Sequence, residues 1–240
     1  MRCTLTFELP EAVFPADSAR LMIGFLKKTI ESYDETLYEK LFGNGQTQMK
    51  SYAYSLYLPV ERFENGQFIL NQPFFRMTFT SCSLEEFGMF FAAFANQKEV
   101  PYHSKGEYQF TLKELTILKN EKVLSEQVVA KFMSPLSVLK HDVETGRKTF
   151  YTVEDEGFAE ALKDTLQYQI KTLAPHLSLD EFEIIPLQVR TVKVSLYNVK
   201  TNATRGSFYL SGSKELLQFL YDAGIGNNRG AGCGLFNIIQ

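Results

Sequence analysis

The last seventeen residues of the chain, 224–240, include the residues whose types and spacing could do chemistry. Five of the fifteen glycines lie between Gly224 and Gly234, together with two asparagines and Arg229. Glycine lets a backbone approach a ligand closely or adopt a positive φ, and successive N–H groups can then form a concave anion site. A guanidinium pairs with phosphate through two hydrogen bonds. The predicted contacts to an anionic backbone are Gly224, Gly226, Asn227, Asn228, Arg229 and Gly230.

A nucleotide-cofactor loop is the obvious alternative for such a segment, and both spacing and context exclude it. The glycines give G-x-G-x-x-x-G, whereas the dinucleotide fingerprint is G-x-G-x-x-G between a strand and a helix. This loop follows the amphipathic helix pattern of 214–223 and leads into the apolar strand 235–239. We therefore expect no cofactor.

Histidine is the side chain that most often moves protons near neutral pH. All three histidines fall in predicted turns or at element ends: His103, His141 and His176. None has a second histidine, cysteine or carboxylate at the spacing of a metal ligand. We interpret them as solvated surface residues.

The cysteines and clustered acids give no metal site either. Cys3, Cys82 and Cys233 are far apart and form no C-x-x-C motif, which is typical of a reducing cytoplasm. The acidic run 154–156 stands at a predicted helix start, where carboxylates complement the helix dipole. No apolar run approaches the roughly 18 residues of a membrane span, and the N-terminus alternates like a strand. We expect a cytoplasmic protein without metal and without membrane contact.

Charge is distributed unevenly along the chain. The formal net charge is −3, yet residues 187–240 carry six basic and two acidic residues, a local balance of +4. The remainder therefore carries −7. A basic face on an acidic body is compatible with binding RNA.

Hydrophobic periodicity divides the chain into two halves with the same order of elements. In the first half, apolar residues at helical spacing from Leu21 to Leu26 predict a helix that opens at 17–18. Ser83 and Glu86 have the spacing of a capping box, which predicts the start of another helix. The remaining predictions are strands over 2–9, 52–58, 68–80 (broken at 71–73) and 108–118, and a helical stretch over 37–42.

The second half repeats this order. Its predicted elements are a strand over 128–133, a hairpin turning at 144–146, a helix over 155–173, strands over 189–199 and 206–210 around Asn202, a helix over 214–223 and a strand over 235–239. The predicted fold class is α+β, with two tandem ferredoxin-like (βαββαβ, RRM-like) domains. The N-terminal domain covers 1–119, and the C-terminal domain covers 120–240 with the glycine-rich loop 224–234.

Four segments, in order along the chain, resemble the CRISPR-associated repeat-RNA processing endoribonucleases of the RAMP superfamily. The segment 223–234 (AGIGNNRGAGCG) is similar to the C-terminal glycine-rich loop of that family. The other three are 206–217 (GSFYLSGSKELL), 132–136 (FMSPL) and 50–55 (KSYAYS). They resemble, respectively, the strand and helix before that loop, the strand end that opens the second domain, and the second strand of the first domain.

The resemblance implies cleavage of a CRISPR precursor transcript within each repeat, without metal. The ribose 2′-hydroxyl attacks the adjacent phosphate and leaves a cyclic phosphate and a 5′-hydroxyl. Such a reaction needs a base, an acid and a cation for the charge that develops on the phosphate. The implied partner is CRISPR repeat RNA, either single-stranded or a hairpin.

The resemblance also suggests which residues are catalytic. In the family a histidine commonly follows the first helix, and here Phe42 stands in its place. Lys27 stands where a first-helix tyrosine often stands, and Lys50 matches the lysine of the second strand. The implied catalytic residues are Lys50, Lys27 and Tyr52, with Tyr33 and Tyr38 as neighbouring phenols.

Two other functions stay open at this stage. The missing histidine motivates a non-catalytic protein that holds repeat RNA for another nuclease or for the subunits of an effector complex. A small-molecule enzyme on a ferredoxin-like scaffold is the third hypothesis, although the sequence shows no cofactor motif. The sequence leaves open whether the protein is a monomer or a homodimer.

Overall fold

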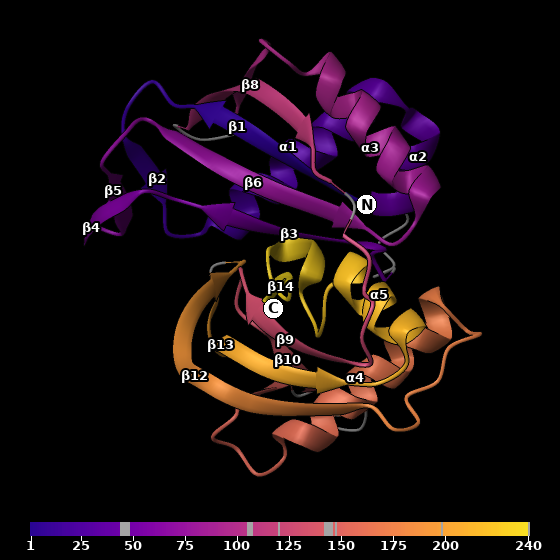
Figure 1. The fold of residues 1–240 in the computed structure, drawn as a ribbon. Helices are drawn as coiled ribbons and strands as arrows, with labels where there is room; N and C mark the ends of the chain where they lie inside the picture. Colours follow the sequence, from indigo (N-terminus) through magenta and orange to yellow (C-terminus); the bar gives the residue numbers. More distant parts are fainter. Residues whose placement is uncertain are drawn as a thin grey trace.

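The structure is a computed structural model that describes residues 1–43, 49–104, 108–119, 121–141, 146, 148–197 and 199–239. It contains two α+β domains, with the N-terminal domain above the C-terminal domain in Figure 1. Each domain has an antiparallel sheet with the strand order of a ferredoxin-like fold, so the predicted fold class is confirmed. Among the described residues, no helix is long and apolar enough to cross a membrane.

The main sheet of the N-terminal domain has the order β3-β6-β1-β8-β7. The elements of this domain are β1 (Arg2–Glu8), β2 (Val13–Pro15), α1 (Ser18–Tyr33), α2 (Glu35–Phe42), β3 (Tyr52–Tyr57), β4 (Val60–Glu64), β5 (Gln67–Leu70), β6 (Phe74–Ser81), α3 (Leu84–Asn96), β7 (Pro101–His103) and β8 (Gln109–Ile117). Helices α1 and α3 lie on one face of the sheet, and β3 is the edge strand nearest to the C-terminal domain (Figure 1).

Aromatic packing forms the core beneath these helices. Phe7 of β1 stacks on Phe75 of β6 with ring centroids 4.6 Å apart, and Phe25 of α1 meets Phe7 edge-on at 5.2 Å. The predicted helix start is confirmed, because the side chain of Asp17 accepts a hydrogen bond from the N–H of Arg20. This core fixes α1 and β3, the two elements that carry Lys27 and Tyr52.

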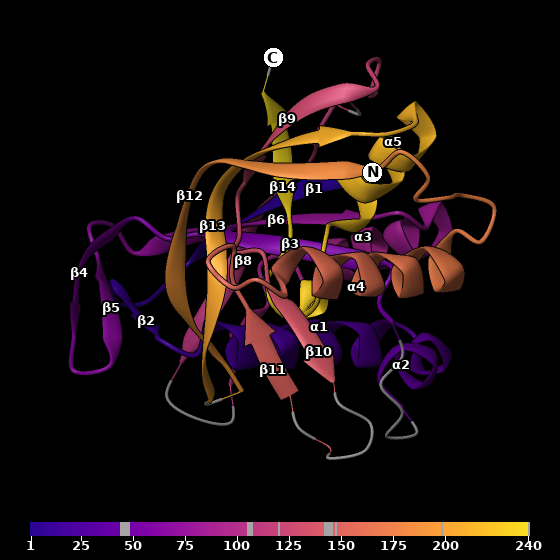
Figure 2. The same ribbon diagram turned by 90° about the horizontal axis from the view of Figure 1, so that it is seen from below.

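The C-terminal domain has a sheet of order β12-β13-β9-β14 and a separate hairpin of β10 and β11. Its elements are β9 (Gln127–Phe132), β10 (Val138–His141), β11 (Lys148–Tyr151), α4 (Phe158–Leu173), β12 (Glu183–Leu196), β13 (Val199–Ser211), α5 (Lys214–Ala223), the 3-10 helix η1 (Arg229–Ala231) and β14 (Phe236–Ile239). Figure 2 shows the β10–β11 hairpin beside α4. The predicted hairpin is thus present, while residues 144 and 145 of its predicted turn lie outside the described residues.

The predicted turn at Asn202 is wrong. β12 and β13 form one long hairpin in which Leu196 pairs with Val199, and Asn202 pairs with Lys193 inside it. The strands continue past Asn202 because Thr201 and Ala203, its neighbours along β13, are buried. Burial of alternate residues here outweighs the preference of asparagine for turns.

The capping box predicted at Ser83 and Glu86 forms only in part. Ser83 caps α3 by accepting a hydrogen bond from the N–H of Glu86, but the carboxylate of Glu86 contacts Ser51 and Lys40. At 152–155 the two side chains form a turn, in which the N–H of Thr152 donates to Asp155 Oδ2 at 2.7 Å. Helix α4 begins after that turn, at Phe158.

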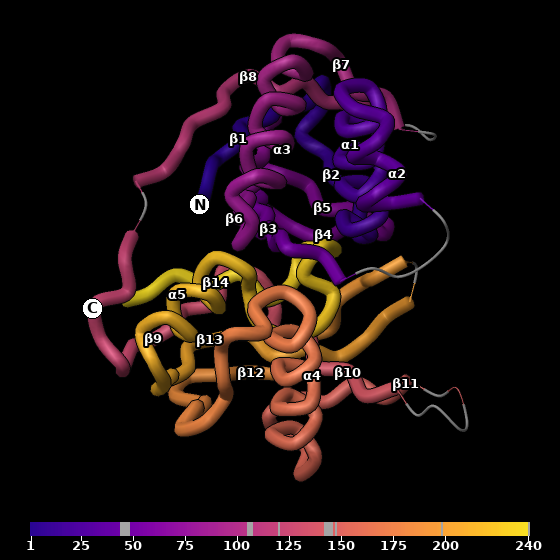
Figure 3. The backbone as a smooth tube through the Cα atoms, turned by 90° about the vertical axis from the view of Figure 1, so that its right-hand side faces the viewer, coloured from indigo at the N-terminus to yellow at the C-terminus, as the bar shows by residue number. Residues whose placement is uncertain are grey.

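The connection between the domains runs from β8 to β9 along one side of the molecule (Figure 3). The predicted boundary between residues 119 and 120 falls in this connection and stays a prediction, since Asn120 lies outside the described residues. A small apolar cluster joins the domains on another side, where Ala19 of α1 packs with Leu196, Ala231 and Cys233.

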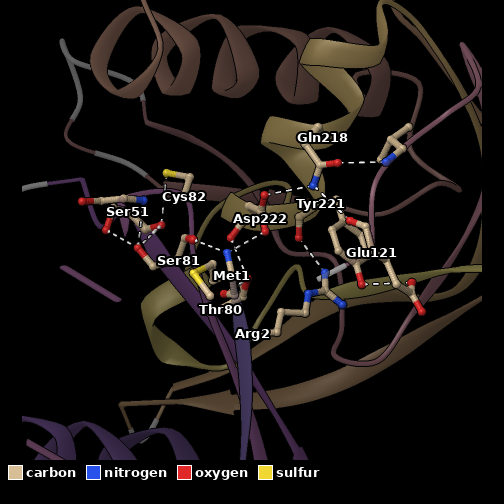
Figure 4. A network of polar contacts seen from close by, with 12 residues as sticks. Met1, Arg2, Ser51, Thr80, Ser81, Cys82, Glu121, Gln218, Tyr221 and Asp222 are labelled. Carbon is tan, nitrogen blue, oxygen red and sulfur yellow. Dashed lines mark hydrogen bonds and ion pairs between the residues drawn. The ribbon is translucent and has the colours of Figure 1, made fainter. Parts of the chain in front are cut away.

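A polar network also joins the two domains (Figure 4). The guanidinium of Arg2, on β1, donates to Asn237 Oδ1 at 2.8 Å and to the backbone oxygen of Tyr221. It also lies over the Tyr221 ring, with Cζ 3.5 Å from the centroid. The amino group of Met1 forms an ion pair with Asp222 at 2.8 Å. These contacts fix the end of α5, where the glycine-rich loop begins.

Candidate functional site

The glycine-rich loop is held by hydrogen bonds to the start of β10 and to Ser137, the residue just before it. The N–H of Asn227 donates to the Ser137 oxygen at 2.8 Å, and Asn228 Nδ2 donates to Ser137 Oγ at 3.0 Å. Asn227 Oδ1 accepts hydrogen bonds from the Leu139 N–H at 2.8 Å and from Thr165 Oγ1 at 3.2 Å. The asparagines predicted to contact RNA therefore also build the loop, a role the sequence interpretation missed.

Three glycines of the loop lie against the N-terminal domain, at β3 and at Lys50, which comes shortly before β3 in the sequence. A Cβ added to Gly224 would be 2.9 Å from Ala53 Cβ. One added to Gly230 would be 3.1 Å from Lys50 Cγ, and one added to Gly232 would be 3.0 Å from Tyr54 Cε2. The close approach that the glycines predict is thus, at these positions, an approach to the N-terminal domain.

Arg229, which the sequence predicts as a phosphate contact, is a buried residue with a structural role. The residue is only 5% exposed, and its Nη1 donates a hydrogen bond to the backbone oxygen of Ala223 at 2.7 Å. Burial lowers the pKa of the guanidinium to about 10, and Cys82 opposes the shift slightly. The arginine caps the end of α5, where a helix has carbonyl groups without intrahelical donors.

Replacing Arg229 with alanine leaves the buried Ala223 carbonyl without this donor. We expect the free energy of unfolding to fall by about 1–3 kcal/mol in urea denaturation. The control Arg62→Ala removes an exposed arginine and is expected to cost under about 0.5 kcal/mol. Arg229→Ala could instead keep the wild-type stability and reduce the slope of log RNA affinity against log salt concentration by about one unit. That result would assign Arg229 a phosphate contact in place of the structural role.

A cleft of about 780 Å³ lies between the domains, and the glycine-rich loop forms part of its wall. We call it the interdomain cleft. The N-terminal domain contributes Lys27 of α1, Phe42 of α2, and Lys50 and Tyr52 at the start of β3. The C-terminal domain contributes the end of β10, one face of α4 and residues 226–231. The structure thus brings the predicted catalytic residues together with five of the six predicted RNA contacts, and Gly224 is buried behind them.

Two lysine amines share one aromatic ring in this cleft. Nζ of Lys50 is 4.9 Å and Nζ of Lys27 is 5.5 Å from the centroid of the Phe42 ring. The Lys50 amine also donates to the backbone oxygen of Leu41. Burial lowers the pKa of Lys50, and the Lys27 cation adds to the shift while Glu86 opposes it. The ring of Phe42 is therefore a cation–π partner of both lysines.

The tyrosines lie in different surroundings. Tyr52 is buried, with its ring stacked on Phe79 at 5.3 Å, and burial raises its pKa. Its hydroxyl therefore keeps its proton near neutral pH and can serve as a hydrogen-bond donor. Tyr33 and Tyr38 do not line the interdomain cleft; Tyr38 instead packs against Phe42 at 5.8 Å.

The sequence interpretation missed three cleft residues from the C-terminal domain. His141 at the end of β10, Tyr168 of α4 and Tyr197 at the tip of the β12–β13 hairpin all line the cleft. Their signal was hidden because each is a solvent-exposed residue of its own element, and only the packing of the two domains brings them together. His103 and His176 are exposed and lie outside the cleft lining, as expected for surface residues.

The fold and the cleft were compared with known proteins. A solved protein described as a RAMP protein binding different RNA substrates matches with a TM-score of 0.84 at 16% identity, covering 100% of both chains. A Cas6-related protein from Pyrococcus furiosus also reaches 0.84 at 16% identity, covering 100% of this chain and 98% of that one. A third solved structure, a CRISPR associated protein Cas6, matches at 0.76 and 19% identity, covering 100% and 99%.

Two ferredoxin-like domains joined across a glycine-rich loop thus define a protein with the RAMP fold. The family described as CRISPR associated protein Cas6, C-terminal, matches residues 118–238, just over half of the 240 residues. The chain belongs to the Cas6 family of CRISPR-associated proteins. A search of curated proteins finds no match.

Proposed function

We propose that this protein binds CRISPR repeat RNA in the interdomain cleft and cleaves the precursor transcript within each repeat. The observation that carries the proposal is the placement of two lysine amines, those of Lys27 and Lys50, beside the glycine-rich loop in a member of the Cas6 family. Cations beside a backbone-lined loop suit a phosphodiester. The similar RAMP protein described as binding different RNA substrates supports RNA as the ligand.

The loop offers donors as well as a surface. Within the described residues, the N–H groups of Asn228, Arg229 and Gly230 have no hydrogen-bond partner, and all three residues line the cleft. Backbone N–H groups that point into a cleft can bind phosphate oxygens and so position an RNA strand. Tyr168 and Tyr197, both more than half exposed, supply aromatic faces on which bases can stack.

The proposed reaction needs no metal ion. The 2′-oxygen forms a bond to phosphorus while the bond from phosphorus to the 5′-oxygen breaks, which leaves a cyclic phosphate and a 5′-hydroxyl. The ammonium of Lys50 would stabilise the charge on the phosphate oxygens, with Lys27 as a second cation. Tyr52 would donate a hydrogen bond through its protonated hydroxyl.

One observation favours the second candidate, a protein that holds repeat RNA without cutting it. The ring of Phe42 stands at the position of the family histidine and cannot move protons, and the Lys50 amine is directed at a carbonyl oxygen. Such a protein would pass the RNA to another nuclease or to an effector complex. Binding alone would then be its measurable activity.

A cleavage assay in a chelator separates the two candidates. We expect the wild-type protein to cut its cognate repeat RNA in excess EDTA, because the proposed chemistry uses side chains only. A single 2′-deoxy substitution at the cut site should abolish cutting while binding persists, because it removes the attacking nucleophile. A repeat of scrambled sequence serves as the control for specificity. Tight binding of the cognate repeat without any cutting would instead support the RNA-holding function.

A further inference from the structure

His141 is placed to take part in the reaction from the C-terminal domain. It is the last residue of β10, it lines the interdomain cleft, and its side chain is exposed. Within the described part of the chain, its imidazole has no hydrogen-bond or ion-pair partner. The imidazole is thus free to contact a bound RNA strand.

The position of His141 is fixed relative to the glycine-rich loop. Two residues before it, the N–H of Leu139 donates to Asn227 Oδ1 at 2.8 Å, and Ser137 forms an antiparallel bridge with Asn227. On its other side, His141 pairs with Lys148 of β11. Leu139 and His141 alternate onto the same face of the hairpin, so the strand that anchors the loop also presents the imidazole to the cleft.

Several other polar groups in the cleft are paired or protonated. The carboxylate of Asp164 lies 3.5 Å from the amine of Lys140, and Asn227 Oδ1 already accepts two hydrogen bonds. Burial raises the pKa of both Tyr52 and Tyr197, so these phenols keep their protons. The amine of Lys50 is directed at the Leu41 oxygen, which suits a protonated donor. Among the described residues that line the cleft, His141 offers an unpaired imidazole, the type of side chain that most often serves as a general base.

We propose that His141 is the general base that removes the proton from the attacking 2′-hydroxyl, an inference that rests on the RNA cleavage proposed above. The neutral imidazole takes the proton as the bond from the 2′-oxygen to phosphorus forms. The bond from phosphorus to the 5′-oxygen breaks, and that oxygen takes a proton from water. Lys50 stabilises the phosphate from the N-terminal domain. The base and the cation thus come from different domains. A base on the C-terminal domain would allow cleavage although the N-terminal domain has Phe42 in place of the family histidine.

This assignment sets the pH dependence of the rate. The charged groups on the elements around the imidazole are Lys148 of β11, Lys140 of β10, Glu160 and Asp164 of α4, Arg229 of the glycine-rich loop, and Lys27 and Lys50 of the N-terminal domain. Because only the neutral imidazole accepts a proton, the logarithm of the single-turnover rate should rise by about one per pH unit at low pH and then level off.

The test is single-turnover cleavage of cognate repeat RNA by the full chain, over a range of pH. His141→Ala should cut at least about 100-fold more slowly than the wild type, with an RNA dissociation constant within about threefold and the low-pH rise lost. Added imidazole should restore part of the rate to His141→Ala. His103→Ala, which removes an exposed histidine outside the cleft, is the matched control and should retain the wild-type rate.

Three outcomes overturn the assignment and can be told apart. In the first, the wild-type protein cuts the RNA and His141→Ala cuts it at the same rate and with the same pH profile. This result would exclude His141 as the base and leave the proposed cleavage intact. A wild-type protein that binds the repeat but never cuts it removes both proposals together. A rate loss in His141→Ala that is matched by an equal loss of affinity would make His141 a binding residue and not a base.

Discussion

Lys50→Ala is expected to lower the single-turnover rate of RNA cleavage by about 100-fold or more, the usual cost of removing one electrostatic contact to a developing charge. The charge on the phosphate grows only in the transition state, so affinity for RNA should change far less than the rate. Lys50→Arg should restore part of the rate, because the guanidinium is also a cation. Cleavage and binding are measured under the same salt conditions.

The placement of Lys50 calls for two controls. Its amine donates to the Leu41 oxygen, so Lys50→Ala also removes a hydrogen bond, which contributes about 0.5–1.5 kcal/mol to stability. Thermal unfolding of the variant measures that loss separately from the rate. Lys28→Ala removes an exposed lysine next to Lys27 on α1, and its rate should equal that of the wild type. A wild-type rate in Lys50→Ala would place the catalytic cation elsewhere.

Gly234→Ala is expected to be the most damaging single-methyl change in the loop. Gly234 has a φ of +75°, and an added Cβ would lie 2.0 Å from the backbone oxygen of Ile225. Backbone must therefore shift in addition to the strain of a positive φ. We expect the free energy of unfolding to fall by about 3 kcal/mol or more, measured by urea denaturation.

Gly66 provides a matched control for that prediction. It has nearly the same φ, +79°, in the turn between β4 and β5, and an added Cβ would have no atom within 4 Å. Gly66→Ala therefore measures the conformational strain alone, about 1 kcal/mol. The difference between the two variants isolates the cost of the clash. Equal losses in both variants would show that the loop relaxes around the new methyl group, against the packing described here.

Local patterns predicted the two domains well, since each element depends on its own periodicity. The cap at Asp17 and the helix Lys214–Ala223 both follow from residues within one or two turns of each other. The turn at Asn202 failed because burial against another element overrode the local preference of asparagine. The fold was thus predictable wherever sequence neighbours decide the structure.

The site was only partly predictable, because it is made by contacts between the domains. The loop was recognised from its glycines, but the sequence could not show that Gly224, Gly230 and Gly232 lie against β3. Arg229 was interpreted as a phosphate ligand because the carbonyl that it binds is six residues away, at the end of a helix. His141 was set aside as a surface residue because its position beside the loop depends on a bridge between residues 137 and 227.

The contacts of Arg2 set an order in which the two domains can join during synthesis of the chain. Arg2 bonds to Asn237, 235 residues later, and to Tyr221, 219 residues later. The first domain can fold while the ribosome is still making the second, but Arg2 gains these two contacts only after residues 221 and 237 have been made. The contact between the domains at the end of α5 is therefore completed later than the fold of the first domain.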